Sequence, residues 1–203
     1  MVMKKITINT VEVAKSQIDL IIRYLNQGKV IAYPTDTIYG LGCDATREAA
    51  IKKIFRIKQR GKDCPLLILV SSFSMLKKYC LVSNKQVEYL KKVWSKSSKP
   101  TTVILKSRGI LPRVLTGGQD SVAVRMPTDL PKNDFLIKII RYTGKPIVST
   151  SLNISGRKNL KDIKMIDKYF KVRPDLVVDG GELKSRASRI VDVREVENVK
   201  IIR

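Results

Sequence analysis

Histidine is absent from the 203 residues of this chain. Histidine is the usual proton-transfer group near neutral pH and the commonest metal ligand in proteins. Its absence therefore excludes mechanisms that depend on an imidazole and all histidine-containing metal sites. Cysteine is also scarce: Cys43, Cys64 and Cys80 are odd in number, and their spacing matches no zinc-binding pattern. We interpret them as free thiols in a reducing compartment.

Long apolar runs are lacking as well. The longest ones, such as PLLILV at 65–70, have the length of a strand and fall far short of the roughly 20 residues that a membrane-spanning helix needs. The first residues, MVMKKITINT, contain two lysines with no apolar segment after them, so no secretory signal is expected. We expect a cytoplasmic protein without membrane association, folded as a single domain over residues 1–203.

Acidic residues are few compared with basic ones. The chain has 40 Lys and Arg against 18 Asp and Glu, a formal net charge of +22. Such an excess favours contact with nucleotides or nucleic acid, and a solvated basic surface is the alternative interpretation. The cations concentrate at 47–62 and 77–108, where Glu48 and Glu88 are the only acids. These segments have few aromatic residues, which suits contact with phosphates better than stacking on bases.

Helix-like and strand-like patterns alternate along the chain. Helical patterns cover 11–26 and 46–58, with Thr46 as a candidate cap. A third helix is expected to begin at Ser71 or Ser72, and a fourth has Pro131 in its first turn and ends near Gly144. Strand patterns occupy 30–34, 65–70, 101–105, 122–127, 146–151, 175–179 and 189–193. We predict an α/β fold with a twisted mixed parallel/antiparallel sheet, in which the closely spaced C-terminal strands favour antiparallel pairing.

Polar residues gather where two of the apolar strands end. The stretch AYPTDTIYGLGCDA at 32–45 offers the hydroxyls of Thr35 and Thr37, while Gly40 and Gly42 allow close approach of a ligand to the backbone. The stretch STSLNISG at 149–156 follows a buried strand with several hydroxyl and amide groups. Each stretch predicts a binding loop. A polar turn and a surface loop are the respective alternatives.

Three cations stand at unusual places. Lys58 and Arg60 follow a helical pattern at a spacing that suits a triphosphate, although a helix C-terminus favours cations in any case. Both side chains can point into one space if the chain is extended there. Arg125 lies in an apolar strand, so its charge must meet a buried acid or a ligand.

Five segments together resemble a known family. YPTDTIYGLGCDA, KQRG…PLLIL, VAVRMP, PIVSTSLNISG and SRIVD occur in the order found in the YrdC/Sua5 family, from about Val11 to Val193. The resemblance implies flanking helices around a large positively charged cavity. It also implies a nucleotidyltransferase, an L-threonylcarbamoyladenylate synthase that joins L-threonine, bicarbonate and ATP and releases pyrophosphate. The product serves t6A modification of tRNA through a tRNA threonylcarbamoyltransferase. Mg²⁺ would arrive on the ATP phosphates, without a metal site of the protein's own.

The resemblance also assigns roles to residues. Lys58 and Arg60 are the catalytic candidates. ATP binding is assigned to Lys58, Arg60, Ser149, Ser151, Asn153 and Ser188, and binding of threonine and the carbamate to Thr35, Thr37, Tyr39, Thr102 and Arg125. Two positions depart from the family pattern: a glycine is missing before Pro100, and Arg189 replaces a threonine. The chain resembles the short, single-domain form.

Two other functions fit parts of the pattern. A non-catalytic double-stranded RNA or tRNA-binding protein would explain the high charge and would release no pyrophosphate. A carbamoyl-adenylate-forming relative, like the domain found in hydrogenase-maturation proteins, would share the motifs. Those proteins are much longer and carry acylphosphatase-like and zinc-finger domains, which this sequence does not contain.

Overall fold

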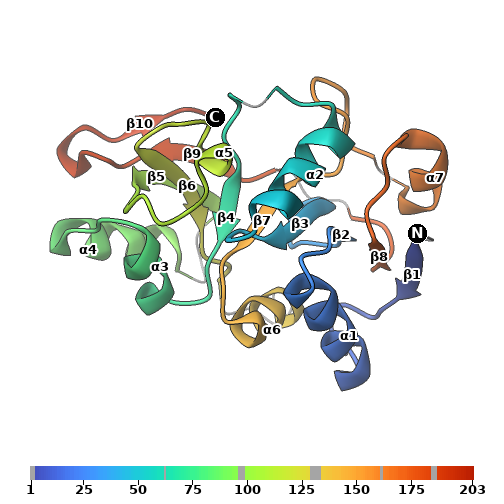
Figure 1. Cartoon of the computed structure of the whole chain (residues 1–203). Helices are drawn as coiled ribbons and strands as arrows, with labels where there is room; N and C mark the ends of the chain where they lie inside the picture. The colour runs from blue at the N-terminus through green and yellow to red at the C-terminus, as the bar shows by residue number, and fades with distance from the viewer. Residues whose placement is uncertain (1–2, 62, 96–98, 129–133, 161, 184–186) are drawn as a thin grey trace.

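The computed structural model describes residues 3–61, 63–95, 99–128, 134–160, 162–183 and 187–203. These residues form a ten-stranded mixed sheet with helices packed on it (Figure 1). The strand order is β1-β8-β2-β3-β7-β4-β6-β5-β9-β10. The predicted α/β fold with mixed parallel and antiparallel pairing is therefore confirmed.

The elements follow the predicted alternation closely. The strands are β1 (Lys4–Thr7), β2 (Ile31–Tyr33), β3 (Gly40–Asp44), β4 (Leu67–Leu69), β5 (Thr101–Lys106), β6 (Ser121–Arg125), β7 (Ile147–Ser151), β8 (Leu176–Asp179), β9 (Arg189–Asp192) and β10 (Lys200–Ile201). The helices are α1 (Lys15–Asn26), α2 (Glu48–Lys58), α3 (Phe73–Tyr79), α4 (Asn84–Val93), α5 (Arg113–Thr116), α6 (Asp134–Thr143) and α7 (Ile166–Tyr169), with short 3₁₀ turns at Ile163–Met165 and Val196–Asn198. None of the helices within the described ranges is long and apolar enough to cross a membrane.

The antiparallel pairing predicted for the C-terminal strands holds for some of them. β7 is antiparallel to β3 and β4, but β8 lies between β1 and β2 and is parallel to both, and β9 is parallel to β5. β8 and β9 lie in opposite halves of the sheet (Figure 1). The antiparallel partner of β9 is the two-residue β10, which is too short to give a pattern in the sequence.

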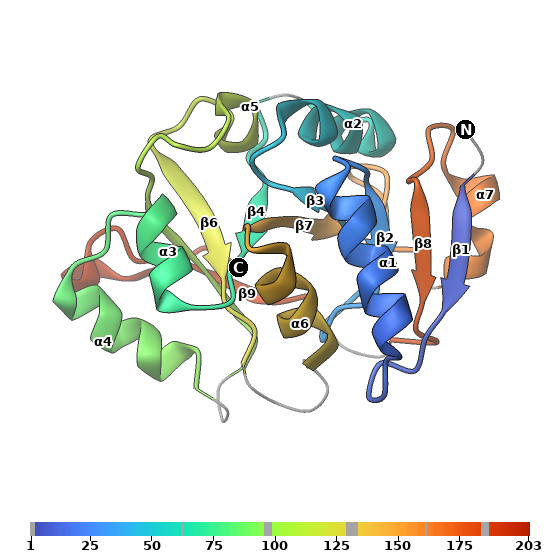
Figure 2. The same cartoon turned by 60° about the horizontal axis from the view of Figure 1, so that its bottom comes forward.

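Apolar side chains form two cores against the sheet. One core joins α1 and α6 with β2, β7 and β8, and includes Ile21, Leu25 and Ile139. Figure 2 shows α1 and α6 together in front of the strands. The second core includes Ile51 and Ile54 of α2 and extends to α3, α4 and the strands β4–β6. The predicted amphipathic faces of α1 and α2 are thus the faces that are buried.

The three helix starts that were predicted have different outcomes. α2 begins at Glu48 with Arg47 as its N-cap residue, so the cap predicted at Thr46 was wrong. Both the amide and the hydroxyl of Thr46 donate to Asp44 Oδ1, at 2.9 and 2.6 Å, which makes Thr46 part of the preceding turn. Ser72 caps α3 by accepting from the amide of Met75, as one of the two alternatives predicted. Pro131 lies outside the described residues.

Strand β3 requires glycine at its centre. A Cβ atom on Gly42 would lie 2.6 Å from Tyr33 Cε1 and 2.9 Å from the carbonyl oxygen of Val148. Such distances are shorter than van der Waals contact, so the ring of Tyr33 and the strand β7 can pack here only against a residue without a side chain. The segment that could have been a polar turn is therefore a turn up to Tyr39 and a buried strand from Gly40 onward.

We predict that Gly42→Ala destabilises the fold, because the added methyl must displace Tyr33 or part the strands. The free energy of unfolding should fall by about 1–3 kcal/mol, as is typical of overpacked cores, and urea unfolding would measure it. Gly61→Ala is the matched control, since no atom lies within 4 Å of a Cβ built there. Equal stabilities of the two variants would contradict the close packing around Gly42.

Candidate active site

A cavity of about 350 Å³ opens among the sheet strands and the β2–β3 loop. It is lined by nearly all of the residues that the motifs singled out: Thr35, Thr37, Tyr39, Arg60, Thr102, Arg125, Ser149, Ser151 and Ser188. These residues come from six separate segments of the chain. The pairing of β3 with β7 brings the motifs YPTDTIYGLGCDA and PIVSTSLNISG together, because Gly40 faces Ser151 and Gly42 faces Ser149 across the ladder.

The hydroxyl of Thr35 builds the β2–β3 loop. Its Oγ1 donates to the carbonyl of Ile38 at 2.7 Å and accepts from the amides of Thr37 and Ile38 at 3.1 and 3.2 Å. The hydroxyl of Thr37 lies 2.9 Å from it. Such side-chain-to-backbone bonds hold a short loop in one shape. Thr35 thus fixes the loop that presents Thr37 to the cavity.

Tyr39 joins this loop to the segment after β8. Its hydroxyl donates to the carbonyl of Gly181 at 2.7 Å and accepts from the amide of Gly180 at 2.9 Å. Burial raises the pKa of Tyr39 to about 12, so the phenol remains neutral. The ring lines the cavity while the hydroxyl is used for this link.

Lys58 and Arg60 do not point into one space. Gln59 between them has a left-handed backbone with φ of 49°, so the chain is not extended here. Arg60 lines the cavity and donates from Nε to the carbonyl of Cys64 at 3.3 Å and from Nη2 to that of Pro65 at 3.1 Å. Lys58 is 1% exposed and absent from the cavity lining.

The ammonium of Lys58 holds the loop after β7 instead. Nζ donates to the carbonyl of Ser151 at 2.5 Å, and to the carbonyl and Oδ1 of Asn153 at 3.0 and 2.8 Å. Burial, and next the charge of Arg60, lower the pKa of Lys58 to about 7. The three oxygens act against this shift, because each stabilises the charged form. Asn153, also outside the lining, accepts in addition from the hydroxyl of Ser151 at 2.6 Å.

Arg125 meets a buried acid, which is one of the two partners that its position suggested, and it also lines the cavity. Its side chain is only 7% exposed and lines the cavity, and its Nη2 donates to Oδ2 of Asp36, which is 3% exposed. Asp36 was not predicted as this partner. The available signal in the sequence was that the motif YPTDTIYGLGCDA contains an acid although the chain has few acids.

Serine and threonine hydroxyls of the cavity also have partners in the fold. The hydroxyls of Thr102 and Ser188 lie 2.9 Å apart, which joins β5 to the residue before β9. Ser149 accepts from the hydroxyl of the fully buried Tyr33 at 2.9 Å. Arg189, which replaces the family threonine, donates from Nε to Thr101 Oγ1 at 2.8 Å and does not line the cavity.

Arg203 is a lining residue that no motif pointed to. Its Nη2 donates to the carbonyl of Ser188 at 3.0 Å. Together with Arg60 and Arg125 it supplies all the charge of the described lining. Arg203 follows the two apolar residues Ile201 and Ile202, and an isolated arginine at such a place gives no sequence signal for a site. It reaches the cavity through the pairing of β9 with β10.

The described residues offer no protein-built metal site. Nowhere in the described ranges do three or more Cys, Asp or Glu side chains come together in a group able to hold a metal ion. The geometry of the cavity instead suits an anionic ligand that carries hydroxyl or carboxylate groups. Its three arginines can bind negative charge, and its hydroxyls can orient the ligand.

Comparison with known sequences gives consistent relatives. The Sua5/YciO/YrdC family model, described as "Telomere recombination", matches residues 23–203. Threonylcarbamoyl-AMP synthase of Pyrococcus abyssi is 36% identical over 174 residues, which are 85% of this chain and 49% of that protein. The chain thus spans about half the length of the archaeal relative. Threonylcarbamoyl-AMP synthase of Vibrio vulnificus is 32% identical over 181 residues, 88% of this chain and 95% of that protein.

Solved structures agree with these sequence matches. P. abyssi Sua5 complexed with L-threonine superposes with a TM-score of 0.85 at 31% identity, over all of this chain and 57% of that one. Escherichia coli YciO has the same fold, with a TM-score of 0.85 at 24% identity over all of this chain and 95% of that one. The match of one family model to residues 23–203, the motifs gathered around one cavity and the shared fold lead to one conclusion: this chain belongs to the Sua5/YciO/YrdC family.

Proposed function

We propose that this protein is an L-threonylcarbamoyladenylate synthase, which makes threonylcarbamoyl-AMP and pyrophosphate from L-threonine, bicarbonate and ATP for t6A modification of tRNA. The observation that carries the proposal is the gathering of the five motif segments around one arginine-lined cavity. The superposition on a threonine-bound relative over the whole chain supports threonine as the amino acid.

The chemistry requires positioning more than a reactive side chain. The threonine amine forms a carbamate, either by attacking bicarbonate with loss of water or by adding to CO₂ with loss of a proton. A carbamate oxygen then attacks the α-phosphorus of ATP, and pyrophosphate leaves. Each step gathers negative charge, so cations and hydroxyl donors fixed in a cavity lower the barrier. No step needs an imidazole, which is consistent with a chain that contains no histidine.

The contacts suggest a division of roles within the cavity. Arg60 and Arg203 would bind phosphate oxygens, and Ser151 and Ser188 offer hydroxyls in the same cavity. Arg125 binds the carboxylate of threonine, near the hydroxyls of Thr37 and Ser149. Lys58 acts on the nucleotide through the loop of Ser151 and Asn153 that it holds. The described lining offers no carboxylate to a metal ion, so Mg²⁺ would be held by phosphate oxygens and water.

The first expected outcome concerns the reaction itself. The purified protein should release pyrophosphate only when ATP, bicarbonate and threonine are all present, and mass spectrometry should find threonylcarbamoyl-AMP. Valine should be rejected by about 10²-fold or more, because it leaves the groups that bond the threonine hydroxyl unpaired. Release without threonine would favour a carbamoyl-adenylate-forming relative. No release under any condition would favour a non-catalytic RNA-binding protein.

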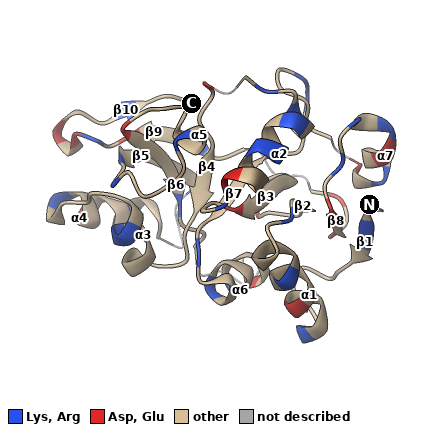
Figure 3. Ribbon diagram, viewed as in Figure 1, with Lys and Arg blue, Asp and Glu red and all other residues tan. Residues whose placement is uncertain are grey.

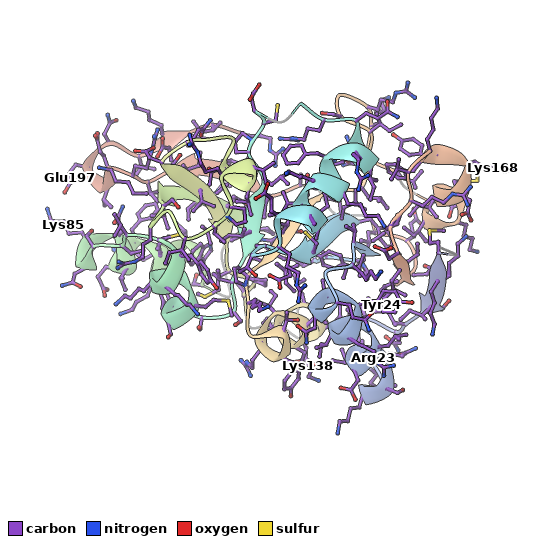
Figure 4. The ribbon with its side chains drawn as sticks, viewed as in Figure 1. Arg23, Tyr24, Lys85, Lys138, Lys168 and Glu197 are labelled. Atoms are coloured by element: carbon purple, nitrogen blue, oxygen red, sulfur yellow. The ribbon has the colours of Figure 1, made fainter. Side chains whose placement is uncertain are left out.

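The second expected outcome concerns the phosphates. Arg60→Ala should lower kcat/KM for ATP roughly ten- to hundred-fold, because a charge-assisted hydrogen bond to phosphate contributes about 1.5–3 kcal/mol. Arg23→Ala removes an arginine from the exposed surface of α1 (Figure 4) and should leave kcat/KM unchanged. If both variants turned over at the wild-type rate, Arg60 would not be a phosphate ligand.

We further propose that tRNA is a partner and contacts the outer face of α2. A second, more open cavity of about 580 Å³ is lined by Lys52, Arg56, Arg60, Gln59 and the apolar Ala49, Phe55 and Val114. Figure 3 shows the cations along α2. Lys53 is excluded from this surface, because its side chain is only 25% exposed and pairs with the buried Asp175 at 2.7 Å. Lys52 is 56% exposed, and its partner Glu48 is exposed as well. A threonylcarbamoyltransferase would then take up the product and transfer it to the tRNA.

The salt dependence of tRNA binding tests this surface. The logarithm of affinity should fall linearly with the logarithm of salt concentration, with a slope of about −0.9 for each phosphate neutralised on duplex nucleic acid. The double variant Lys52→Gln/Arg56→Gln should flatten the slope, and pyrophosphate release should stay near wild type, since neither residue lines the inner cavity. Lys138→Gln/Lys168→Gln, on α6 and α7 (Figure 4), is the charge-matched control. Identical slopes in all three proteins would mean that the cations of α2 do not contact tRNA phosphates and only form a solvated surface.

A further inference from the structure

We propose that Asp36 is a positioning residue, which orients the guanidinium of Arg125 for the carboxylate of the amino-acid substrate. The inference rests on the proposed function, because Arg125 is there the carboxylate ligand. Asp36 lies one residue from each threonine of the first motif, yet its side chain is not part of the cavity lining. It would therefore act on the substrate through Arg125.

Arg125 needs a fixed orientation and Asp36 supplies it. Arg125 is the last residue of β6 and Asp36 belongs to the β2–β3 loop, so the ion pair joins β6 to a loop whose two strands are not neighbours of β6 in the sheet. A guanidinium is planar and carries five N–H donors in a rigid arrangement. A contact at Nη2 therefore sets the direction of the other donors. A carboxylate that binds two parallel donors is sensitive to that direction.

Stability alone is a poor explanation for this ion pair. Both side chains are almost fully buried, and the cost of removing two charges from water usually cancels the attraction between them. Oδ1 of Asp36 is in addition buried without any hydrogen-bond partner, and it is the only such side-chain atom in the described part of the chain. An unsatisfied buried acceptor destabilises the folded state. The pair therefore carries a penalty that an ion pair selected for stability would not keep.

The other buried acids of the protein differ in this respect. Oδ1 of Asp175 accepts from Lys53 at 2.7 Å and Oδ2 accepts from the amide of Val30 at 2.8 Å. Asp44 accepts from Thr46 through Oδ1 and from Lys145 through Oδ2, at 2.6 and 2.9 Å. None of these four partners lines the cavity, whereas the partner of Asp36, Arg125, does. These two acids have hydrogen bonds to both oxygens and no link to the cavity, and Asp36 has one oxygen without a partner and a link to the cavity.

Tyr33, a second buried side chain close enough to feel the charges of the pair, bonds to another residue of the cavity lining. Tyr33 is fully buried, and both charges of the pair act on its phenol. Burial is the main cause that raises the pKa of Tyr33, so the phenol stays neutral and donates to Ser149 at 2.9 Å. Two cavity-lining residues, Arg125 and Ser149, are thus each held from behind by a buried partner that does not itself line the cavity.

The test is Asp36→Asn, which keeps the shape of the side chain and removes its charge. The KM for threonine should rise roughly ten- to hundred-fold, as expected when a binding group loses its orientation, while the KM for ATP stays within about two-fold. The preference for threonine over threonine amide, which lacks the carboxylate, should shrink by a similar factor. Asp175→Asn is the matched control: it also breaks a buried ion pair, and it should lower the melting temperature without a selective rise in the KM for threonine.

Asp36→Glu decides the matter if the asparagine variant does not fold. It retains the charge and moves the carboxylate by one methylene, so a selective rise in the KM for threonine is again expected. An unchanged KM for threonine in a folded variant would overturn the role of Asp36. Calorimetric titration with threonine separates this result from failure of the proposed function. Wild-type protein that neither binds threonine nor releases pyrophosphate would refute the function itself, whatever the variants do.

Discussion

The pairing of β3 with its two neighbours is the constraint on which the rest of the molecule depends. β3 is antiparallel to β2 on one side and to β7 on the other, and glycine at position 42 lets both lie close. This register sets the β2–β3 loop beside the end of β7, and so places the hydroxyls of Thr37 and Ser151 at one cavity. A shift by one residue would turn every side chain of β3 to the other face of the sheet. The cavity is therefore a product of sheet register as much as of the motifs.

The sequence predicted the apolar strands β2 and β4–β9 and most of the polar residues that line the cavity, because local patterns indicate both. It did not predict β1, β3 or β10, which lack a long apolar run. Apolar runs bounded by Gly, Pro and Ser gave the core strands, and hydroxyl-rich ends gave Thr37, Ser149 and Ser151. What failed was everything decided by partners distant in sequence. The Asp36–Arg125 pair spans 89 residues, and β8 and β9 each pair with strands from earlier in the chain. Lys58 and Arg60 diverge because one residue between them takes a left-handed conformation, which periodicity does not predict for glutamine.

The cations behind the net charge of +22 include two groups with different surroundings. Lys58, Arg125 and Lys53 are largely buried and are held by loop oxygens or by an acid. Lys52, Lys85 and Lys138 are exposed and pair only with exposed acids on the surface, where such pairs contribute little. The buried cations shape the site, and the exposed cations determine the electrostatic field around the protein. Composition alone does not distinguish them, because burial decides which role a given cation has.

The three thiols of the chain differ sharply in their surroundings. Cys43 and Cys80 are buried and Cys64 is exposed. Burial raises the pKa of Cys43 and of Cys80, which keeps both as unreactive thiols. The carbonyl of Cys64 accepts from Nε of the cavity-lining Arg60 at 3.3 Å. A maleimide dye would therefore attach at one place in the native protein, on the backbone segment tied to Arg60. A fluorescent dye on Cys64 would thus report ligand entry into the cavity, and no cysteine needs to be introduced for this purpose.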